Sequence, residues 1–336
     1  MPKNSRPNIE LGYWISSEEH TPNDLVQHAQ RAEEMGFPFA LISDHFHPWI
    51  DRQGHSPFVW SVIGAIAHAT QHLRLGTAVT CPTIRIHPSI IAQAAATAAT
   101  MMPGRFFLGV GTGENLNEHI LGNRWPPSDV RREMLAEAVE VIRLLWEGGE
   151  QSHHGKYYTV ENARLYTLPD RGAPPPLLIA ASGKKSAELA GHLGDGLIAV
   201  APLAELVESF KWAGGMNKAC YAKLGVCWAK SEAEARRTAY ELWPTSGLGG
   251  ELFTELPLPA HFEQAAKRVS EEDVVKDLAY GPDPKRYLDG IKKFAEAGFT
   301  HLALHQIGPD QEGFFRFWEN EIQPHFSSEW VLEKAF

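Results

Sequence analysis

The sequence predicts an α/β protein whose fold is a (β/α)8 barrel, with loop insertions at the carboxyl-terminal face of the barrel. Short apolar runs typical of buried strands alternate with segments of helical periodicity along the chain. A unit of helix, glycine and buried strand recurs, since Gly36 precedes the strand 39–42 and Gly298 precedes the strand 301–304. Eight strands in such alternation favour a closed parallel barrel over an open doubly wound sheet.

The first strand is expected at residues 8–14, which alternate in polarity. Thr21 then supplies a helix N-cap, Pro22 suits the first turn, and Asp24 completes a capping box. The helix that follows ends at Gly36. Further strands are expected at residues 73–77, 106–110, 177–181, 196–200 and 224–228, and further helices at 59–69, 89–101, 129–147, 187–191, 232–242 and from about 284 to 298.

Two segments, about 150–173 and 244–270, do not fit the alternation and are expected to be insertions in barrel loops. Long loops in a compact domain usually carry a binding function or act as lids. The chain contains no stretch with the composition of a linker, so residues 1–336 are expected to form a single domain.

Composition narrows the class of protein. The 336 residues are 43% hydrophobic and carry a formal charge of −10, which excludes a disordered chain. The basic residues form no stripe, so nucleic acid is not expected as a partner and a small molecule is. No apolar stretch is long enough to span a membrane, and the first residues lack a signal-peptide core, so we expect a cytoplasmic protein. Cys81, Cys220 and Cys227 form no C-x-x-C pair and are expected to be reduced thiols.

In a barrel, the residues that follow the carboxyl ends of the strands build the active site. The strand 39–42 is followed by Asp44, His45, His47 and Trp49. Imidazoles beside a carboxylate suit proton transfer. The alternative interpretation is a helix-capping aspartate beside surface histidines.

Three more strand ends carry candidate residues. The strand 106–110 continues through three alternating glycines to Gly113 and Glu114, which lets a backbone approach a flat ring or a phosphate, although the spacing is a weak nucleotide fingerprint. The strand 73–77 leads into small residues up to Cys81 and Pro82, which indicates a bend against a ligand. Lys184 and Lys185 stand at a helix start behind the strand 177–181 and predict an anion site.

Several motifs occur in register with those of one family. They are Ser43-Asp-His-Phe46 with Pro48-Trp49, Leu75-Gly-Thr77, Pro82-Thr83-x-Arg85, Gly109-Val-Gly-Thr-Gly-Glu114 and Ala190-Gly-x-x-Gly-Asp-Gly196. Together they resemble the F420-dependent glucose-6-phosphate dehydrogenases of the bacterial luciferase-like superfamily of flavin and deazaflavin barrels. The likeness runs from about residue 9 to 200 and from about 276 to 325. It implies a barrel that holds coenzyme F420 at its carboxyl-terminal face, commonly as a homodimer.

The resemblance also implies roles for single residues. His45 matches the catalytic base, Asp44 its partner at the deazaflavin, Trp49 the active-site tryptophan, and Glu114 the acid near ring nitrogen N1. A histidine with a pKa near ~6.5 suits a base that takes the hydroxyl proton while a carbinol is oxidised. The positions that match cofactor-binding residues are Asp44, Ala78 and Val79 (a non-proline cis peptide behind the bent ring), Cys81, Gly113, Glu114, Asn117, Ser182 and Gly183, with Cys81 in place of the usual threonine and Ser182 in place of the usual glycine.

The sequence departs from the family where the substrate phosphate is bound. Two lysines and an arginine are replaced by Ala201 or Pro202, by Phe253 and by Asp277. An aspartate in place of an arginine repels a phosphate dianion, unless Lys218, Lys267 or Arg268 rebuilds the site. We therefore expect a neutral or differently substituted secondary alcohol, sugar or ketone as the substrate, rather than glucose 6-phosphate.

Three other functions compete with F420-dependent hydride transfer. An FMN-dependent monooxygenase of the same superfamily differs in its cofactor. A metal-dependent hydrolase barrel is the second alternative. Its metal ligands would be His45 and His47 together with His301 and His305, and Asp44 and Glu114 could serve as further ligands. It leaves Trp49 and the glycine segment without a role, so no metal site is expected. Binding without catalysis is disfavoured because the base and acid positions are both filled.

Overall fold

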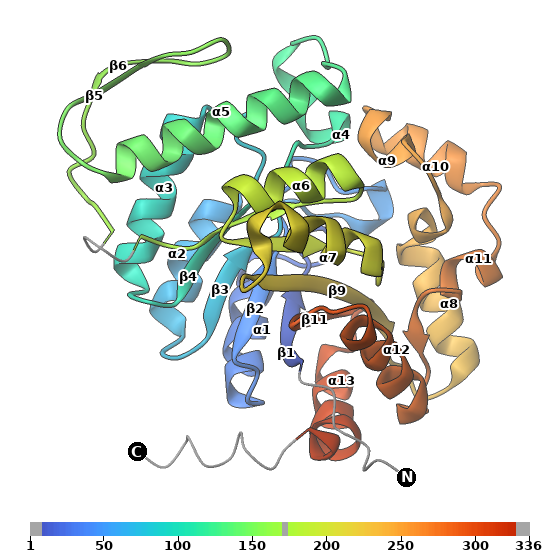
Figure 1. The fold of residues 1–336 in the computed structure, drawn as a ribbon. Coiled ribbons are helices and arrows are strands. Elements are labelled where there is room, and N and C mark those ends of the chain that lie inside the picture. Colours follow the sequence, from blue (N-terminus) through green and yellow to red (C-terminus); the bar gives the residue numbers. More distant parts are fainter. Residues whose placement is uncertain (1–8, 170–173, 327–336) are drawn as a thin grey trace.

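Eight parallel strands close into a barrel in the computed structural model, which describes residues 9–169 and 174–326 (Figure 1). Around the barrel the strands follow the order β1, β2, β3, β4, β7, β8, β9 and β11, and β11 pairs with β1 to close the ring. The predicted (β/α)8 fold is thereby confirmed. The strands are β1 (Glu10–Ile15), β2 (Phe39–Ile42), β3 (Arg74–Thr77), β4 (Phe106–Val110), β7 (Leu177–Ala180), β8 (Gly196–Ala199), β9 (Ala219–Cys227) and β11 (His301–Gln306).

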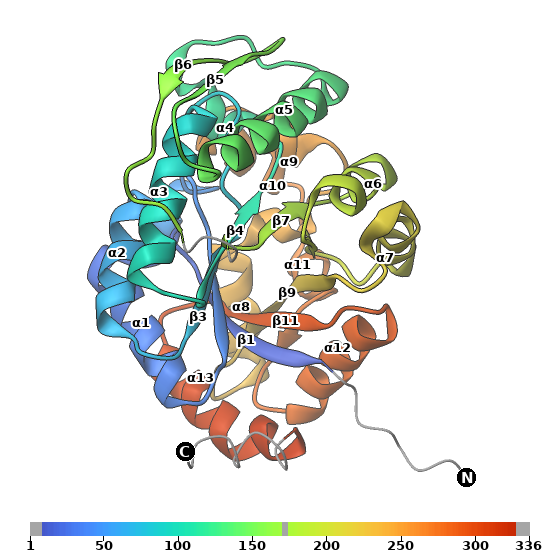
Figure 2. The same cartoon turned by 60° about the vertical axis from the view of Figure 1, so that its left-hand side comes forward.

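Helices surround the barrel, and α1, α2 and α3 lie next to one another on its outer side (Figure 2). The first of them begins with the predicted capping box, in which Thr21 and Asp24 each bond the other's backbone N–H. Among the described helices, none has the length and apolar character that crossing a bilayer requires. The helices are α1 (Pro22–Glu34), α2 (Val59–Ala69), α3 (Pro88–Met101), α4 (Asn115–Glu118), α5 (Ser128–Trp146), α6 (Lys184–Leu193), α7 (Ala204–Phe210), α8 (Glu232–Leu242), α9 (Leu252–Glu255), α10 (Pro259–Ala266), α11 (Glu271–Val275), α12 (Pro284–Glu296) and α13 (Gln311–Phe317).

Strand β9 begins at Ala219, earlier than the predicted start at residue 224. In its first half, the side chains of Tyr221 and Lys223 share the inner face of the barrel, and that of Ala222 lies on the outer face. Because Lys223 interrupts the apolar run, the sequence pattern does not predict this half as a strand. Pairing with both β8 and β11 extends it nonetheless.

The segment 150–173 contains an antiparallel hairpin of β5 (Gln151–His154) and β6 (Thr159–Ala163), and its residues 170–173 lie outside the described part of the chain. The hairpin belongs to the connection from α5 to β7. It folds back along α5, where Glu137 accepts hydrogen bonds from the backbone of Tyr157 and Tyr158. The Tyr158 hydroxyl donates to the Thr83 carbonyl at 3.0 Å, so the hairpin reaches the segment that follows β3.

The segment 244–270 is part of a longer excursion that leaves the end of β9 and includes α8, α9, α10 and α11. A short strand, β10 (Ala279–Tyr280), ends the excursion by pairing with the last residues of β9. These helices therefore stand beside the carboxyl-terminal mouth of the barrel, on the side of β9 (Figure 1).

Large side chains fill the barrel interior below its mouth. The rings of Phe39, Phe107 and Tyr221 pack against one another inside the barrel. A Cβ atom on Gly76 would collide with the Phe107 ring, so glycine is required at that position. Because this end is filled, a ligand can enter only from the carboxyl-terminal end.

Candidate active site

A buried ion pair joins the ends of the first two strands. Nδ1 of His45, which follows β2, lies 2.7 Å from Oε1 of Glu18, which follows β1. The other carboxylate oxygen, Oε2, accepts hydrogen bonds of 2.9 Å from the hydroxyls of Ser16 and Ser43. Glu18 is thus held by three partners and in turn fixes the orientation of the imidazole.

The pair shifts the pKa values of both members. Burial lowers the pKa of His45, but the charge and hydrogen bonding of Glu18, with the charges of Glu114 and Asp44, together outweigh burial, so the pKa of His45 lies above its usual value. Burial raises the pKa of Glu18, but the charge and hydrogen bonding of His45, with the hydrogen bond from Ser16, together lower it to about 2. With Nδ1 occupied by Glu18, Nε2 is the nitrogen of His45 that remains for a substrate proton.

Asp44 is the centre of a second polar network. Its Oδ2 accepts a hydrogen bond from the Thr80 hydroxyl at 2.7 Å, and its Oδ1 accepts one from Nη2 of Arg85 at 2.8 Å. Arg85 also pairs with Glu118, because its backbone N–H donates to Oε2 of Glu118 at 2.7 Å. The network ties the segment after β2 to those after β3 and β4.

Glu118 carries a perturbed carboxyl group. Burial raises its pKa to about 7, with help from the charges of Glu114 and Asp44, and the bonds from Arg85 offset only part of the increase. The Glu118 side chain lies directly behind the glycine segment, where its Cγ would be 3.1 Å from a Cβ atom on Gly113. Each strand-end residue contacts a polar partner: Asp44 contacts Arg85, His45 contacts Glu18, and Glu114 contacts Asn117.

An aromatic wall flanks the base. The ring of Trp49 meets the His45 ring edge-on at 5.1 Å between centroids. On its other sides Trp49 packs against Phe253 of α9 at 5.3 Å and Phe262 of α10 at 5.2 Å. The excursion after β9 thus supplies an apolar wall beside His45 at the mouth of the barrel.

The glycine segment after β4 packs closely against the segment after β3. Gly113 has a φ of +77°, and a Cβ atom there would lie 2.5 Å from Sγ of Cys81. Glu114 follows as the N-cap residue of α4, with its side chain partly exposed. Asn117 donates to Glu114 at 3.3 Å and accepts from the backbone N–H of Phe46 at 2.9 Å. Asn117 therefore ties α4 to the segment that carries His45.

The peptide bond between Ala78 and Val79 is cis, as the family resemblance implies. It follows β3, and Val79 is partly exposed there. Cys81 is buried beyond it, with Sγ 2.9 Å from the Thr83 hydroxyl oxygen. Burial raises the pKa of the Cys81 thiol well above its usual value, so the thiol stays protonated.

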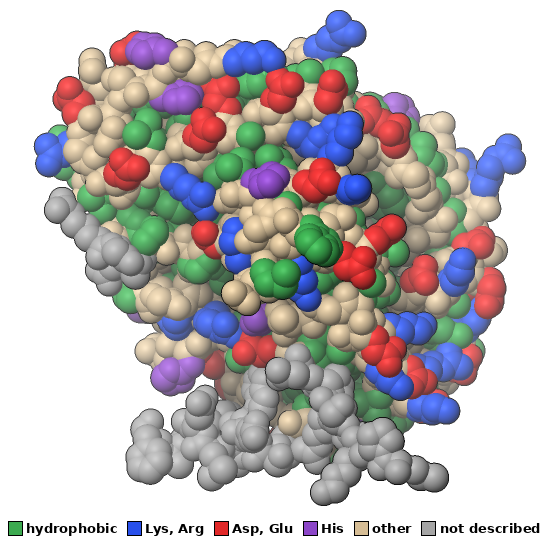
Figure 3. Space-filling view, viewed as in Figure 1, with side chains coloured by type: hydrophobic (Ala, Val, Ile, Leu, Met, Phe, Trp, Pro, Cys, Tyr) green, Lys and Arg blue, Asp and Glu red, His purple; other side chains and the backbone are tan. Residues whose placement is uncertain are grey.

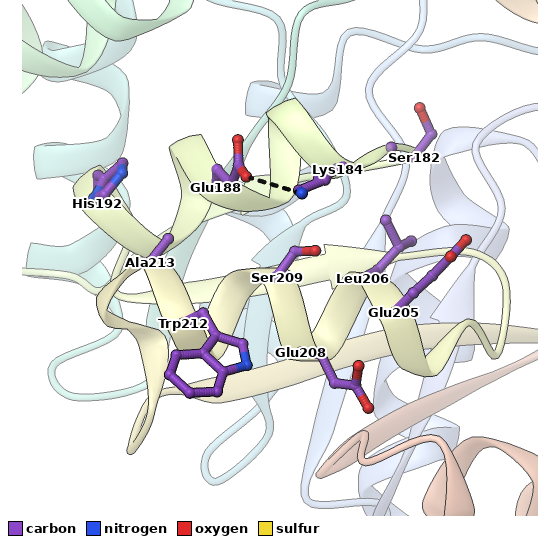
Figure 4. Close-up of a pocket in the computed structure, with 11 residues that line it drawn as sticks. Ser182, Lys184, Glu188, His192, Glu205, Leu206, Glu208, Ser209, Trp212 and Ala213 are labelled. Atoms are coloured by element: carbon purple, nitrogen blue, oxygen red, sulfur yellow. Dashed lines mark ion pairs between the residues drawn. The ribbon is translucent and has the colours of Figure 1, made fainter.

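Ser182 and Gly183 lie further round the rim, at the start of α6, and open into a pocket of about 630 Å³ between α6 and α7 (Figure 4). No atom would come within 4 Å of a Cβ on Gly183, so the entrance is open. Lys184 is paired with Glu188 at 3.9 Å. Trp212, which follows α7 and lines this pocket, is 86% exposed. In the space-filling view, hydrophobic side chains on this face are interspersed with charged ones (Figure 3).

The histidines of the alternative metal site lie in separate contacts. His47 turns away from His45, with Nδ1 2.9 Å from the Leu116 carbonyl oxygen. His301 stacks on Tyr221 near the start of β11, and His305 pairs with Glu19 at 2.9 Å. Within residues 9–169 and 174–326, no group of three His, Cys, Asp or Glu side chains is arranged to hold a metal ion.

The three cationic residues that could replace the phosphate-binding residues of the family do not gather at the mouth of the barrel. Lys218 donates to the carbonyls of Gly191 and Gly194 at 2.9 and 2.8 Å, and so caps the end of α6. Lys267 and Arg268 are exposed at the end of α10.

Three residues of this site are not predicted from the sequence. Glu18 follows the end of β1, and the strand-end rule that identified Asp44 and His45 would have identified it too. Arg85 belongs to one of the family motifs, but no role was assigned to it. No sequence pattern points to Glu118, because its pairing with Arg85 depends on the fold.

The chain is similar to known proteins over nearly its whole length. A profile of the luciferase-like monooxygenase family matches residues 9–301. The F420-dependent glucose-6-phosphate dehydrogenases of Segniliparus rotundus and Microbacterium testaceum are 34% and 35% identical to it, over 95% and 94% of this chain and 98% and 97% of those relatives. The structure of an F420-dependent secondary alcohol dehydrogenase in complex with an F420-acetone adduct has a TM-score of 0.88 at 30% identity, covering 95% of this chain and 99% of that one.

Proposed function

This chain belongs to the luciferase-like monooxygenase family, within it to the F420-dependent glucose-6-phosphate dehydrogenase-like enzymes, and from that premise we propose that it transfers a hydride between a neutral secondary alcohol and coenzyme F420. It is an oxidoreductase, and its cofactor is the deazaflavin F420. The observation that carries the proposed chemistry is the buried pair of His45 and Glu18 beside Trp49.

The mouth of the barrel fits such a cofactor. Val79 offers an apolar surface behind a flat ring, and Glu114 offers a partly exposed carboxyl group next to Gly113. The open entrance at Ser182 and Gly183, at the N-terminus of α6, suits the cofactor phosphate. When bound, F420 supplies the hydride-accepting and hydride-donating carbon of the reaction.

The protein moves the protons. Nε2 of His45 takes the hydroxyl proton of the carbinol, and the carboxylate of Glu18 stabilises the imidazolium that forms. Trp49 holds the imidazole edge-on and excludes water from that side. Glu114 serves as the acid at the other end of the site, and the carboxyl of Glu118, whose pKa is raised to about 7, lies behind it.

The substrate that we propose carries no phosphate. Phe253 packs on Trp49 where the relatives are expected to have a cation, Asp277 is exposed, and Lys218 is committed to α6. A phosphate dianion at this wall would be desolvated without a matching charge, which costs several kcal/mol.

One experiment tests the proposed function. Purified protein is titrated with F420 and with FMN, and the F420 complex is then screened against alcohols, sugars and glucose 6-phosphate by loss of the oxidised deazaflavin absorbance. We expect tight binding of F420, weak binding of FMN, and a higher kcat/KM for neutral alcohols than for glucose 6-phosphate. Tight binding of FMN alone would point to the monooxygenase alternative, and a clear preference for the phosphate would refute the neutral substrate.

We also propose that the protein works as a homodimer in the cytoplasm. An apolar groove of about 310 Å³ runs between α2 and α3, and Phe58, Ile90 and Met101 beside it are 57%, 54% and 46% exposed. A second copy of the same face would cover these side chains.

A further inference from the structure

Lys223 brings a positive charge into the barrel. It lies on β9 two residues after Tyr221, whose side chain belongs to the interior cluster, so both side chains face inward. Its partner in register on β11 is Ala303, which also faces the interior. Lys223 is the next inward position towards the carboxyl-terminal mouth, where the apolar filling ends.

The ammonium of Lys223 lies between two tryptophan rings. Its Nζ is 4.9 Å from the ring centroid of Trp14 and 5.1 Å from that of Trp243. Within the described ranges, no acceptor lies at hydrogen-bond distance from Nζ and no carboxylate lies at ion-pair distance. An ammonium carries three N–H donors, and the side chain is only partly buried, so these donors remain available to a ligand.

The carboxylates nearby are already committed to other partners. Glu18 holds His45, and Glu19 pairs with Nε2 of His305 at 2.9 Å and accepts from the backbone N–H of Gly308 at 3.0 Å. Burial lowers the pKa of Lys223, and the charges of Glu18 and Glu19 act against that decrease. Trp14 and Trp243, which flank Lys223, both pack against His305, at 6.0 and 4.9 Å between ring centroids, and His305 pairs with Glu19, the residue next to Glu18. Lys223 therefore lies on the side of the barrel mouth that carries the pair of Glu18 and His45.

The charged side chains near Lys223 favour a neutral ligand over an anion. Glu18 is balanced by His45, whose pKa is raised. Burial lowers the pKa of His305, so the imidazole beside the Glu19 carboxylate does not offset its negative charge. A carboxylate or phosphate brought to Lys223 would therefore be repelled by Glu19, whereas a hydroxyl or carbonyl oxygen would accept a hydrogen bond without adding charge.

We propose that Lys223 is a substrate-binding residue, whose ammonium donates a hydrogen bond to a second oxygen, a hydroxyl or a carbonyl, of a neutral alcohol or ketone whose carbinol stands at His45. The inference rests on the proposed function and deepens it by naming the substrate class. The rings of Trp14 and Trp243 bound the same space, which suits a short carbon chain between the two oxygens.

The test compares 2-butanol with 2,3-butanediol, which differ by one hydroxyl. In Lys223→Met, we expect kcat/KM with F420 to fall roughly 10- to 100-fold for the diol, as for a lost hydrogen bond to a charged group, and to change less than about twofold for 2-butanol. Lys223→Gln, which keeps an N–H donor, should recover part of the loss. Lys230→Met, an exposed lysine beyond the same strand, is the matched control and should match the wild-type protein.

A second measurement needs no cofactor. Because Trp14 and Trp243 flank Lys223, 2,3-butanediol should change the tryptophan fluorescence of the F420-free wild-type protein and Lys230→Met, but not of Lys223→Met. Retained F420 binding by Lys223→Met serves as the check on its fold.

Three outcomes would overturn the inference. They are an equal loss for both alcohols in Lys223→Met, no loss for either, or a wild-type preference for 3-hydroxybutyrate over the diol, which would make Lys223 an anion site. If the wild-type protein oxidises neither alcohol, the proposed function fails, and the fluorescence titration alone then decides for or against Lys223.

Discussion

Nδ1 of His45 lies 2.7 Å from Oε1 of Glu18, and the pair is buried at the mouth of the barrel with Trp49 against its imidazole. The carboxylate holds the imidazole in one orientation and raises its pKa. Both effects favour a base whose Nε2 faces the substrate. This relationship is the basis on which we propose His45 as the catalytic base.

Replacing Glu18 should move the pH dependence of turnover. In Glu18→Gln the charge that raises the pKa of His45 is lost, so this pKa falls and the deprotonated base persists to lower pH. We expect the acidic limb of kcat/KM to shift down by about one pH unit, and the plateau to decrease because the imidazole is less well oriented. Glu19→Gln, at the neighbouring position but bonded to His305, should leave the limb in place. An unchanged limb in Glu18→Gln would show that His45 is not the titrating base.

Removing the base itself should stop turnover. In His45→Ala we expect kcat to fall roughly 10²- to 10⁴-fold, the range of a lost general base, while the Kd for F420 changes little. Steady-state kinetics and a fluorescence titration with F420 measure the two effects separately. Turnover that survives would move the role to Glu114, since His47 is directed at the Leu116 carbonyl.

Glu118 should make stability depend on pH. Its pKa is raised to about 7 in the folded protein from a usual value of 4.5, so the folded state binds the proton more tightly than the unfolded chain. The contribution to stability is therefore present at low pH and is lost as the pH rises from about 4.5 to about 7. The free energy of unfolding of wild-type protein minus that of Glu118→Gln should fall by roughly 1–3 kcal/mol across this window. Urea unfolding of the cofactor-free proteins measures it, and exposed Glu251→Gln is the control that should show no such trend.

Gly113 should be irreplaceable for two separable reasons. Its φ of +77° disfavours any other residue, and a Cβ atom would lie 2.5 Å from Sγ of Cys81. Gly113→Ala should lower the free energy of unfolding by roughly 1–3 kcal/mol and weaken F420 binding. Gly122→Ala, with a φ of +78° and open space around the Cβ, carries only the backbone cost.

Adding Cys81→Ala to Gly113→Ala isolates the contact. The double variant should recover the part of the loss that exceeds Gly122→Ala, and a double-mutant cycle by urea unfolding quantifies it. Additive losses would show that Cys81 does not constrain the glycine segment.

The groove between α2 and α3 should be the dimer interface. Ile90→Glu places a charge on the exposed apolar face of α3 and should convert the dimer into a monomer in multi-angle light scattering. Trp212→Glu, at the 86% exposed tryptophan that follows α7, should leave the dimer intact. A monomeric wild-type protein would contradict the proposal.

Local patterns predicted much of this protein. Alternating strands and helices established the barrel, the capping box at Thr21 was correct, and the strand-end rule placed Asp44, His45 and Glu114 at one mouth. These features depend on residues close together in the sequence, where periodicity and turn chemistry act directly. The start of β9 was misplaced because the inward Lys223 interrupts its apolar pattern.

The partners of these residues were decided by the tertiary structure. Glu19 and His305 are 286 positions apart, and Glu18 meets His45 only because β1 and β2 are neighbours in register. Closure of the barrel turns Lys223 towards Trp14 and Trp243, and folds Glu118 behind Gly113. The sequence by itself determined which residues stand at the mouth, because strand ends are local. The burial that raises the pKa of Glu118 and the charge that raises the pKa of His45 exist only once the strands close around them.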